Sequence, residues 1–559
     1  MNLTDRREQR LQSYKKIQSE KEIYECVLAP TLYEFVLWVL QEALQSGKKR
    51  LYFLARDGYQ MYLAARQLCK QYNLDIECRY LKVSRYAVRV PEYHLLGERC
   101  LERICVGGID VTFEKIMQRA ALTDKEAEEI AALAGYTENY RKVINYHEVM
   151  QLKDRLKKIP LLFHYIDSHS KEAYGTAIGY LTQEGLLEQI PYALVDSGWI
   201  GTIQQSIEHL LRQKQPDRKL EGYYFGLYEI PEGEGRENYH SFYFTPWGEI
   251  KRKVHFSNSL FEAVFSAPEG MTLSYRTEGG KDKIIYVPVT DSRENLNRER
   301  ISRYICWLEE FLQEKKQSLP QADSGYVEEL LSPFMGNPTQ FEAEAYGSLL
   351  FSDDVREDNN QKVSADFSEQ EIKNHHLLNR LLIMTGVRKK VLHESAWIEG
   401  SIATCRTLDE KGRARNRLHA VFYKYIIYIC KWLKQRNRYV VNSIGRTRLY
   451  HLISCAETLH CENPDKVADD WIRDYNLTEG NFDITAVDPE LADVIPTALD
   501  MGEVYQRLIV DTLGANEDYI DGILRVYNNP ICDVIDNYNC SAFYEPSYVI
   551  ARAYQNGGF

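Results

Sequence analysis

The sequence predicts an α/β fold, with a Rossmann-like parallel sheet, helical insertions and a mainly helical C-terminal region. Two observations support this fold. Short apolar runs that end in polar or glycine-containing turns recur between residues 50 and 230, and segments of helical periodicity lie between them. Strands that alternate with helices pair in parallel through right-handed crossovers. Unbroken apolar runs are typical of strands that helices cover on both faces.

The individual elements follow in order along the chain. Residues 30–46 carry an apolar stripe at helical spacing, which Pro30 can begin and Gly47 can end. Further helices are expected over 59–71, 203–212 and most of 95–190. Strands are expected at 51–55, 76–83, 192–195 and 220–228. Because ligands of parallel sheets bind beyond the carboxyl ends of the strands, the turns after these strands are the expected place for a site.

The length of 559 residues is too great for one ordinary core and predicts two or three domains. We expect an α/β catalytic domain over 1–275 with a helical insertion at about 95–190. A linker and irregular region is expected over 276–370, where polar residues, glycine and proline gather. A mainly helical C-terminal domain is expected over 371–559, with a role in binding the acceptor or a membrane surface.

Composition narrows the class of protein. The net charge of −12 argues against nonspecific nucleic-acid binding, which needs a basic face. The charged N-terminus has no apolar segment of the kind found in signal peptides, and no run of 18 or more apolar residues is present. The 12 cysteines form no CxxC pair, which favours reduced thiols over disulfides or a zinc site. We therefore expect a soluble cytoplasmic protein.

The stretch from Asp196 to Thr202 is the strongest indication of a ligand site. Asp196 ends an apolar strand, and Ser197, Gly198, Gly201 and Thr202 follow before a helix begins. Glycines allow close approach of a ligand, and a helix N-terminus binds anions. Thr202 can donate to a phosphate, whereas Asp196 can receive ribose hydroxyls or hold a metal-bound water. The alternative is a plain strand–turn–helix corner in which Asp196 caps the helix.

A second strand-end turn, Arg56-Asp57-Gly58, has a similar composition. Gly58 permits an unusual backbone turn, and Arg56 offers a fork of donors to a phosphate. Asp57 can coordinate Mg²⁺ or act as a base. Lys82 and Arg85 flank the end of the next strand and can neutralise a diphosphate. A structural Arg–Asp pair is the alternative for this turn, and basic residues after a strand are common.

Two further groups are weaker candidates. Glu262 is a carboxylate in an otherwise apolar helical segment, where it would be an acid/base residue or a buried structural partner. His164, Asp167 and His169 could form half of a metal site or an acid/base pair. A loop with ordinary solvated histidines is the favoured interpretation of that segment.

Residues 411–448 form a basic block in an acidic protein, with an aromatic helix at 421–432 inside it. Such a helix can rest on an anionic membrane surface. The favoured alternative is a core helix whose ends are solvated by basic side chains. The basic residues of the block are Lys411, Arg413, Arg415, Arg417, Lys424, Lys431, Lys434, Arg436, Arg438, Arg446 and Arg448.

Four segments are informative together, namely YFLARDGYQM (52–61), YLKVSRYAV (80–88), ALVDSGWIGTIQ (193–204) and LFEAVFSAPEG (260–270). They resemble a domain that occurs in proteins of bacterial surface-polysaccharide loci, often fused to a phosphatase domain of the haloacid-dehalogenase (HAD) type. The resemblance covers about residues 25–275. This chain has no Asp-x-Asp-x-Thr strand end, the pattern that supplies the nucleophile of such phosphatases. The resemblance therefore does not imply hydrolase activity.

The order of parts also resembles a divergent type I phosphoribosyltransferase. In that family an early loop contacts diphosphate, and a later acidic strand end with a Thr/Gly loop holds ribose hydroxyls and the 5-phosphate. The resemblance places 56–58 in the first role and 196–202 in the second. The sequence departs from the family where the usual second acid is Ser197 and where the Thr/Gly run is reduced to Gly201-Thr202.

The two resemblances imply one activity, transfer of 5-phosphoribose from phosphoribosyl diphosphate to a capsule or O-antigen glycan, with Mg²⁺ as cofactor. A separate HAD-type phosphatase would then remove the phosphate to leave ribofuranose. The acceptor is expected to be a glycan, lipid-linked where the basic block contacts the inner face of the membrane. The rivals are a sugar-nucleotide glycosyltransferase, a HAD-like hydrolase and a non-catalytic partner in glycan assembly.

Overall fold

The computed structural model describes residues 19–455 except 109, 232–233, 235, 279–282, 289–293, 314–318, 352–360, 385–386 and 389–391. Side chains are not described at 288, 294–296, 384 and 433–455. The chain divides into two compact units, residues 1–429 and 430–559. The fold and the candidate site described below belong to the first unit.

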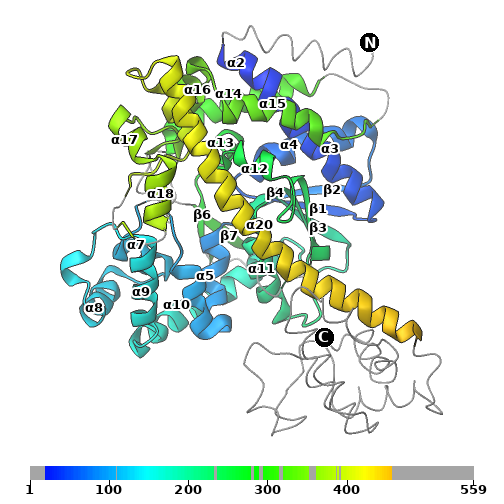
Figure 1. Ribbon diagram of the computed structural model, residues 1–559. Helices are drawn as coiled ribbons and strands as arrows, with labels where there is room; N and C mark the ends of the chain where they lie inside the picture. Colours follow the sequence, from blue (N-terminus) through cyan, green and yellow to red (C-terminus); the bar gives the residue numbers. More distant parts are fainter. Residues whose placement is uncertain are drawn as a thin grey trace. The chain divides into compact units, whose positions relative to one another are not determined.

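A five-stranded parallel sheet forms the centre of the first unit (Figure 1). Its order is β2-β1-β3-β4-β5, one of the common orders of doubly wound α/β sheets. The predicted α/β class is thus confirmed. The edge strand β5 was not predicted from the sequence. The strands are β1 (Arg50–Leu54), β2 (Glu77–Leu81), β3 (Tyr192–Trp199), β4 (Gly222–Leu227) and β5 (Tyr239–Phe244).

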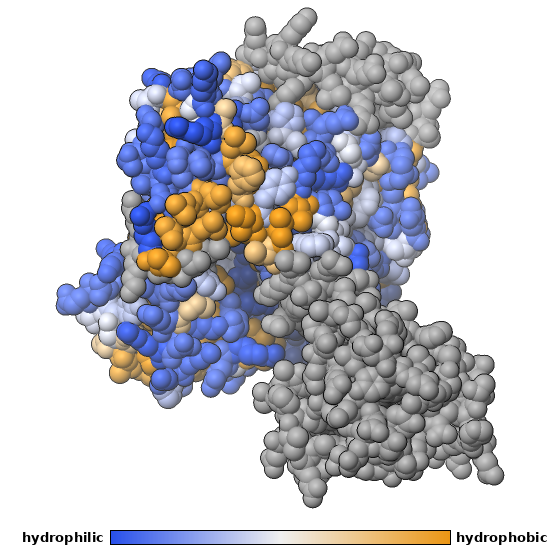
Figure 2. Space-filling view, viewed as in Figure 1, coloured by the Kyte–Doolittle hydropathy of each residue, from blue (hydrophilic) through white to orange (hydrophobic). Residues whose placement is uncertain are grey.

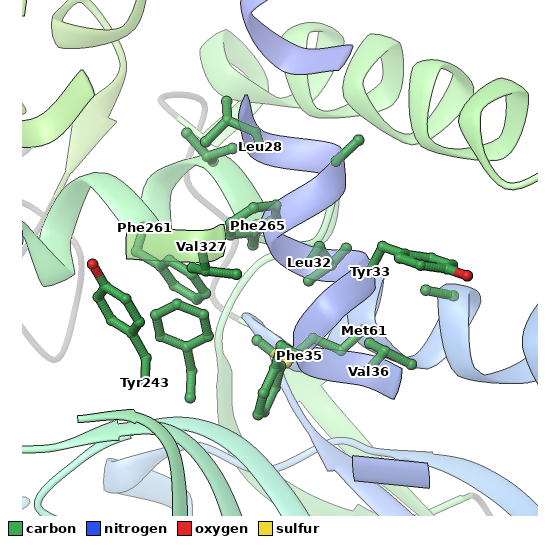
Figure 3. Close-up of a cluster of buried hydrophobic side chains, with 14 of the residues drawn as sticks. Leu28, Leu32, Tyr33, Phe35, Val36, Met61, Tyr243, Phe261, Phe265 and Val327 are labelled. Atoms are coloured by element: carbon green, nitrogen blue, oxygen red, sulfur yellow. The ribbon is translucent and has the colours of Figure 1, made fainter. Parts of the chain in front are cut away.

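Successive residues of the central strands point to opposite faces of the sheet. Phe53 of β1 belongs to the apolar cluster on one face, whereas Tyr52 and Leu54 belong to the cluster on the other. Helices α3 (Ala29–Gln45) and α4 (Gly58–Tyr72) pack on the first face. Figure 3 shows Phe35 and Met61 of these helices in that cluster, together with Phe261 and Val327 from later in the chain. The second face is covered by α5 (Arg85–Leu96), α10 (Pro160–Gln183) and α11 (Thr202–Arg212).

The segment between β2 and β3 is a helical insertion with an apolar core of its own. Four of its helices begin at residues whose side chains accept a backbone N–H, namely Ser84, Thr112, Thr123 and Asn145. The helices that follow α5 are α6 (Leu101–Ile104), α7 (Phe113–Arg119), α8 (Asp124–Ala134), α9 (Tyr146–Leu156) and α10. The helical character expected at about 95–190 is therefore observed.

Residues 276–370 differ from the linker that we expected. They contain helices, of which α14 supplies Tyr304 and α15 supplies Phe334 to the same core as α3. Their exposed faces are polar, so average composition concealed an apolar stripe. Correspondingly, the compact unit continues to Ile429 and does not end at 275 or 370. The elements between β5 and 370 include α12 (Ile250–Val254), α13 (Asn258–Phe265), β6 (Thr272–Thr277), β7 (Ile284–Pro288), α14 (Glu294–Phe311), α15 (Ser324–Gly336) and α16 (Gln340–Gly347).

The part of the expected C-terminal domain that the structure describes is mainly helical. It contains α17 (Glu369–Asn374), α18 (Leu377–Met384), α19 (Ile398–Thr404) and α20 (Glu410–Cys455). Residues 456–559 of that expected domain lie outside the described residues. In the described part of the chain, one helical stretch, Glu20–Gln45, is long and apolar enough to cross a membrane. Because 78% of its most apolar window is buried inside the protein, it has the environment of a core helix.

Candidate functional site

A cavity of about 260 Å³ lies at the carboxyl ends of β1 and β3. These strands are neighbours in the sheet, but the chain leaves them in opposite directions, toward β2 and toward β4. Ligands of doubly wound sheets bind at such a switch point. All four segments quoted above contribute to the cavity lining, through residues such as Asp57, Arg85, Asp196 and Glu262. The sheet topology thus brings together segments that are far apart in the sequence.

Asp57 lies at the start of α4, directly beyond β1. Its carboxylate accepts a hydrogen bond of 2.5 Å from the Ser197 hydroxyl. Burial raises the pKa of Asp57, and this hydroxyl together with the charges of Arg56 and Arg85 opposes the rise. A carboxyl group in this state is a stronger base than a solvated aspartate once it is ionised.

Asp196 lies near the end of β3 and is only 8% exposed. Burial raises its pKa to about 8, and repulsion from Asp57 and Glu262 adds to the rise, while Arg85 opposes it. Carboxyl groups with strongly raised pKa values in a cavity are typical of functional sites. This pair of acids favours a ligand that brings a positive charge or hydrogen-bond donors.

Glu262 reaches the same cavity from α13. The indole Nε1 of Trp199 donates a hydrogen bond to its carboxylate, and the Arg85 guanidinium lies 3.6 Å from it. The side chain is thus held in position at the cavity wall. Glu262 therefore has the structural role that we considered, and it also lies beside the candidate acids of the cavity.

The glycine turn before α11 differs in detail from the predicted loop. Strand β3 continues through Trp199, so the residues from Asp196 to Trp199 are strand residues and only Ile200 and Gly201 join the strand to the helix. Gly198 has φ +108°, and a Cβ there would lie 2.6 Å from the Gly226 carbonyl oxygen. Only glycine fits that position without a shift of the backbone.

Helix α11 begins at this turn without a side-chain cap. Its N-cap residue is Gly201, with φ +71°, and the first turn carries no acidic residue. Thr202 lines the cavity. The N-terminus of α11 therefore presents an anion-binding environment.

Some predicted residues do not line the cavity. Lys82 forms an ion pair with Glu269, and its ammonium group lies 4.5 Å from the Tyr80 ring centroid and 4.9 Å from that of Tyr286. It is therefore a poor match to the diphosphate role that we expected. Gly58 and Gly201 also lie outside the lining and act through the backbone. A Cβ at Gly58 would lie 3.1 Å from the main chain of Phe53, so this glycine lets α4 pack closely on β1.

Three arginines of the cavity were missed, namely Arg89, Arg103 and Arg119. They belong to the helical insertion, where no motif marked them. The available signal was the spacing of Arg85 and Arg89, which places both on one face of α5 beside a strand end.

The site fits a metal ion only if a substrate supplies some of the ligands of that ion. Among the described residues, no group of three or more His, Cys, Asp or Glu side chains is arranged to hold a metal. Asp57 and Asp196 remain as two carboxylates in one cavity. Mg²⁺ is commonly bound through one or two carboxylates together with substrate phosphates. The two carboxylates are consistent with this kind of Mg²⁺ binding and not with a site whose ligands all come from the protein.

The histidine group is separate from the cavity lining. His164, Asp167 and His169 lie on helix α10 and not in the loop that we expected. His169 Nε2 lies 2.9 Å from a Glu126 carboxylate oxygen, and Asp167 pairs with Lys171 at 2.7 Å. These partners account for His169 and Asp167 as structural contacts of the helices.

The basic block is partly engaged within the protein. Arg417 donates to the Pro338 carbonyl at 2.8 Å, and Lys424 pairs with Glu399 at 2.7 Å. Tyr428 stacks on Tyr228, so one side of α20 packs against the core. Its other side exposes Leu418 and Phe422, and Figure 2 shows apolar surface gathered along this part of the helix. The side chains from Lys434 to Arg448 lie outside those described.

No protein-family model and no curated protein matches this chain.

Proposed function

We propose that the chain is a phosphoribosyltransferase that moves 5-phosphoribose from phosphoribosyl diphosphate to a glycan acceptor in bacterial surface polysaccharide biosynthesis. One observation carries the proposal. Asp57 and Asp196, both with raised pKa values, share a cavity with several arginines at the switch point of a parallel sheet. That arrangement suits a sugar with phosphate groups and free hydroxyls. The sequence resemblance to surface-polysaccharide proteins supports the choice of acceptor.

The charges of the cavity suggest how the donor binds. Arg56 and Arg85 provide guanidinium groups for the diphosphate beside the carboxylates. Asp196 would hold Mg²⁺ jointly with the diphosphate, which leaves Asp57 available as a base, and the ion would offset the negative charge of the leaving group. Asp196 is also placed to accept hydrogen bonds from ribose hydroxyls.

The proposed reaction is a displacement at C1 of the ribose. The bond from C1 to the diphosphate oxygen breaks, and its electron pair leaves with the diphosphate. The acceptor hydroxyl oxygen forms the new bond to C1 and loses its proton to Asp57. The raised pKa of Asp57 suits this role of base. The arginines stabilise the charge that develops on the departing diphosphate.

The cellular setting follows from the product. A 5-phosphoribosyl glycan needs a separate HAD-type phosphatase before it carries plain ribofuranose. We place the enzyme in the cytoplasm, where phosphoribosyl diphosphate is made. Contact with the inner face of the membrane through 411–448, and thereby with a lipid-linked acceptor, is part of this proposal. The exposed apolar side of α20 supports it, whereas the internal pairing of Lys424 removes one cation from it.

Calorimetric titration with phosphoribosyl diphosphate and Mg²⁺ tests the donor. We expect micromolar binding that requires Mg²⁺ and is lost in Asp196→Ala. Asp167→Ala is the matched control, because it removes a carboxylate of α10 outside the cavity lining. If phosphoribosyl diphosphate does not bind and a sugar nucleotide does, the glycosyltransferase rival replaces the proposal. If Asp57→Ala and Asp196→Ala leave glycan production in cells intact, the protein is a non-catalytic partner.

A further inference from the structure

Two arginines of the helical insertion meet the first turn of α11. The Arg89 guanidinium donates a hydrogen bond of 2.8 Å from Nη2 to the Thr202 hydroxyl. Arg103 donates from its Nη2 to the side-chain oxygen of Gln205. Thr202 and Gln205 are three residues apart, so they lie on the same face of α11. The insertion thus brings two cations to the open N-terminus of this helix, beside the cavity.

The Arg89 guanidinium is only partly satisfied within the protein. The Nε of Arg89 is buried and has no hydrogen-bond partner in the described part of the protein. Burial lowers the pKa of Arg89 to about 10, and repulsion from Arg85 and Arg103 acts in the same direction. Glu92 is the acid that opposes this effect, but its carboxylate already bonds Ser206 and His209.

Two other groups near the cluster are engaged elsewhere in the protein. The side-chain amide of Gln205 donates to Glu234 at 2.9 Å, which uses one oxygen of that acid. Arg119, only 8% exposed, adds a third guanidinium to the lining and donates to the Val106 carbonyl at 2.7 Å. A buried donor without a partner is costly, so an anion that accepts a hydrogen bond from Arg89 would be favoured here.

We infer that Arg89 and Arg103, with Thr202 and the first turn of α11, bind a phosphate monoester of the substrate and select donors that carry one. The inference rests on the proposed function, in which this group is the 5-phosphate of the donor. The inference assigns the choice between donors to side chains of the helical insertion, and these side chains act together with the glycine turn that follows β3.

The position of the cluster explains why it would discriminate between donors. Asp57, Asp196 and Glu262 line the same cavity and repel an anion, so phosphate groups are favoured beside the arginines and hydroxyls beside the acids. A donor phosphorylated at both ends matches this pattern. A sugar nucleotide that placed an uncharged base near Arg89 would leave the guanidinium without its counter-charge.

Fragment titration separates this subsite from the rest of the site. The probes are ribose 5-phosphate, ribose, and diphosphate with Mg²⁺, and the variants are Arg89→Gln and Arg89→Lys. Arg141→Gln is the matched control, since Arg141 lies in the same insertion with an 80% exposed side chain. We expect wild-type protein to prefer ribose 5-phosphate to ribose by at least about 10-fold, as charge-assisted hydrogen bonds imply. Arg89→Gln should lose that preference, while diphosphate binding changes by less than about 3-fold.

The outcomes distinguish the inference from the proposed function. Two results would overturn the inference even if phosphoribosyl diphosphate binds. One is equal affinity of the wild type and Arg89→Gln for ribose 5-phosphate. The other is a wild-type protein that binds ribose 5-phosphate no more tightly than ribose. Arg89-dependent binding of ribose 5-phosphate without binding of phosphoribosyl diphosphate supports the subsite and rejects the transfer reaction. Partial recovery in Arg89→Lys supports a charge interaction. A thermal unfolding midpoint that falls in Arg89→Gln, with the ligand preference unchanged, would show a structural contact only.

Discussion

Ser197 donates a 2.5 Å hydrogen bond to the carboxylate of Asp57, although 140 residues separate the two in sequence. The contact follows from the sheet, because β1 and β3 are parallel neighbours and each residue lies near the carboxyl end of its strand. In the family that the sequence resembles, an acid is usual at the position of Ser197. Here Ser197 has a hydroxyl group at that position. A second carboxylate would repel Asp57, whereas the hydroxyl donates a hydrogen bond to it and lowers its pKa.

Replacement of Ser197 by alanine should shift the pH dependence of the reaction. Without the hydroxyl, the pKa of Asp57 rises further, so less of the base is ionised at pH 7. The acidic limb of the rate profile should move to higher pH. We expect a loss of about 10-fold near pH 7 that narrows toward pH 9. Diphosphate release from phosphoribosyl diphosphate, with water as acceptor, measures it. A loss of the same size at every pH would contradict this explanation, and Asp57→Asn should be inactive throughout.

Asp196 should destabilise the folded protein at neutral and alkaline pH. Its pKa is raised to about 8 from 3.8, so between these values the folded state holds a proton that the unfolded state has lost. Stability from this group is therefore lost as pH rises from about 4 to about 8. Asp196→Asn removes the effect and should be more stable than wild type by about 1 to 3 kcal/mol at pH 8, with a smaller gain at pH 5.

Urea unfolding at the two pH values checks this expectation. Asp75→Asn is the control of opposite sign, because Lys49 lowers the pKa of that exposed aspartate. Its replacement should reduce stability slightly at pH 8. An equal effect of Asp196→Asn at pH 5 and pH 8 would show that the aspartate is ionised in the folded protein at both pH values and would contradict this expectation.

Residues at strand ends could be predicted from the sequence because the sheet fixes their place. Once Asp57 and Asp196 are assigned to the ends of parallel strands, their proximity requires only that the strands pair. The surroundings of Lys82 could not be predicted, because Glu269 and Tyr286, which engage it together with the neighbouring Tyr80, lie far from it in the sequence. Arg103 and Arg119 were not predictable, since no periodicity states how a helical insertion folds back over a sheet.

Gly198 should tolerate no side chain. A Cβ at this position would lie 2.6 Å from a backbone oxygen of β4, and its φ of +108° strains any other residue. We expect Gly198→Ala to cost about 2 to 4 kcal/mol in unfolding free energy. Gly107→Ala is the matched control, because Gly107 also lines the cavity but a Cβ there would have no neighbour within 4 Å. Equal stability of the two variants in urea unfolding would mean that the β3–β4 contact yields easily.

The contrast between Lys82 and Arg85 tests the assignment of the diphosphate end. Both follow β2, but only Arg85 lines the cavity, while Lys82 is paired with Glu269. Arg85→Gln should weaken binding of diphosphate with Mg²⁺ by about 10-fold or more, as loss of a charge-assisted hydrogen bond implies. Lys82→Gln should change it by less than about 3-fold and act on stability through its lost ion pair. Calorimetric titration and thermal unfolding of both variants give the comparison. If Lys82→Gln has the larger effect on binding, the diphosphate lies nearer the end of β2 than the cavity indicates.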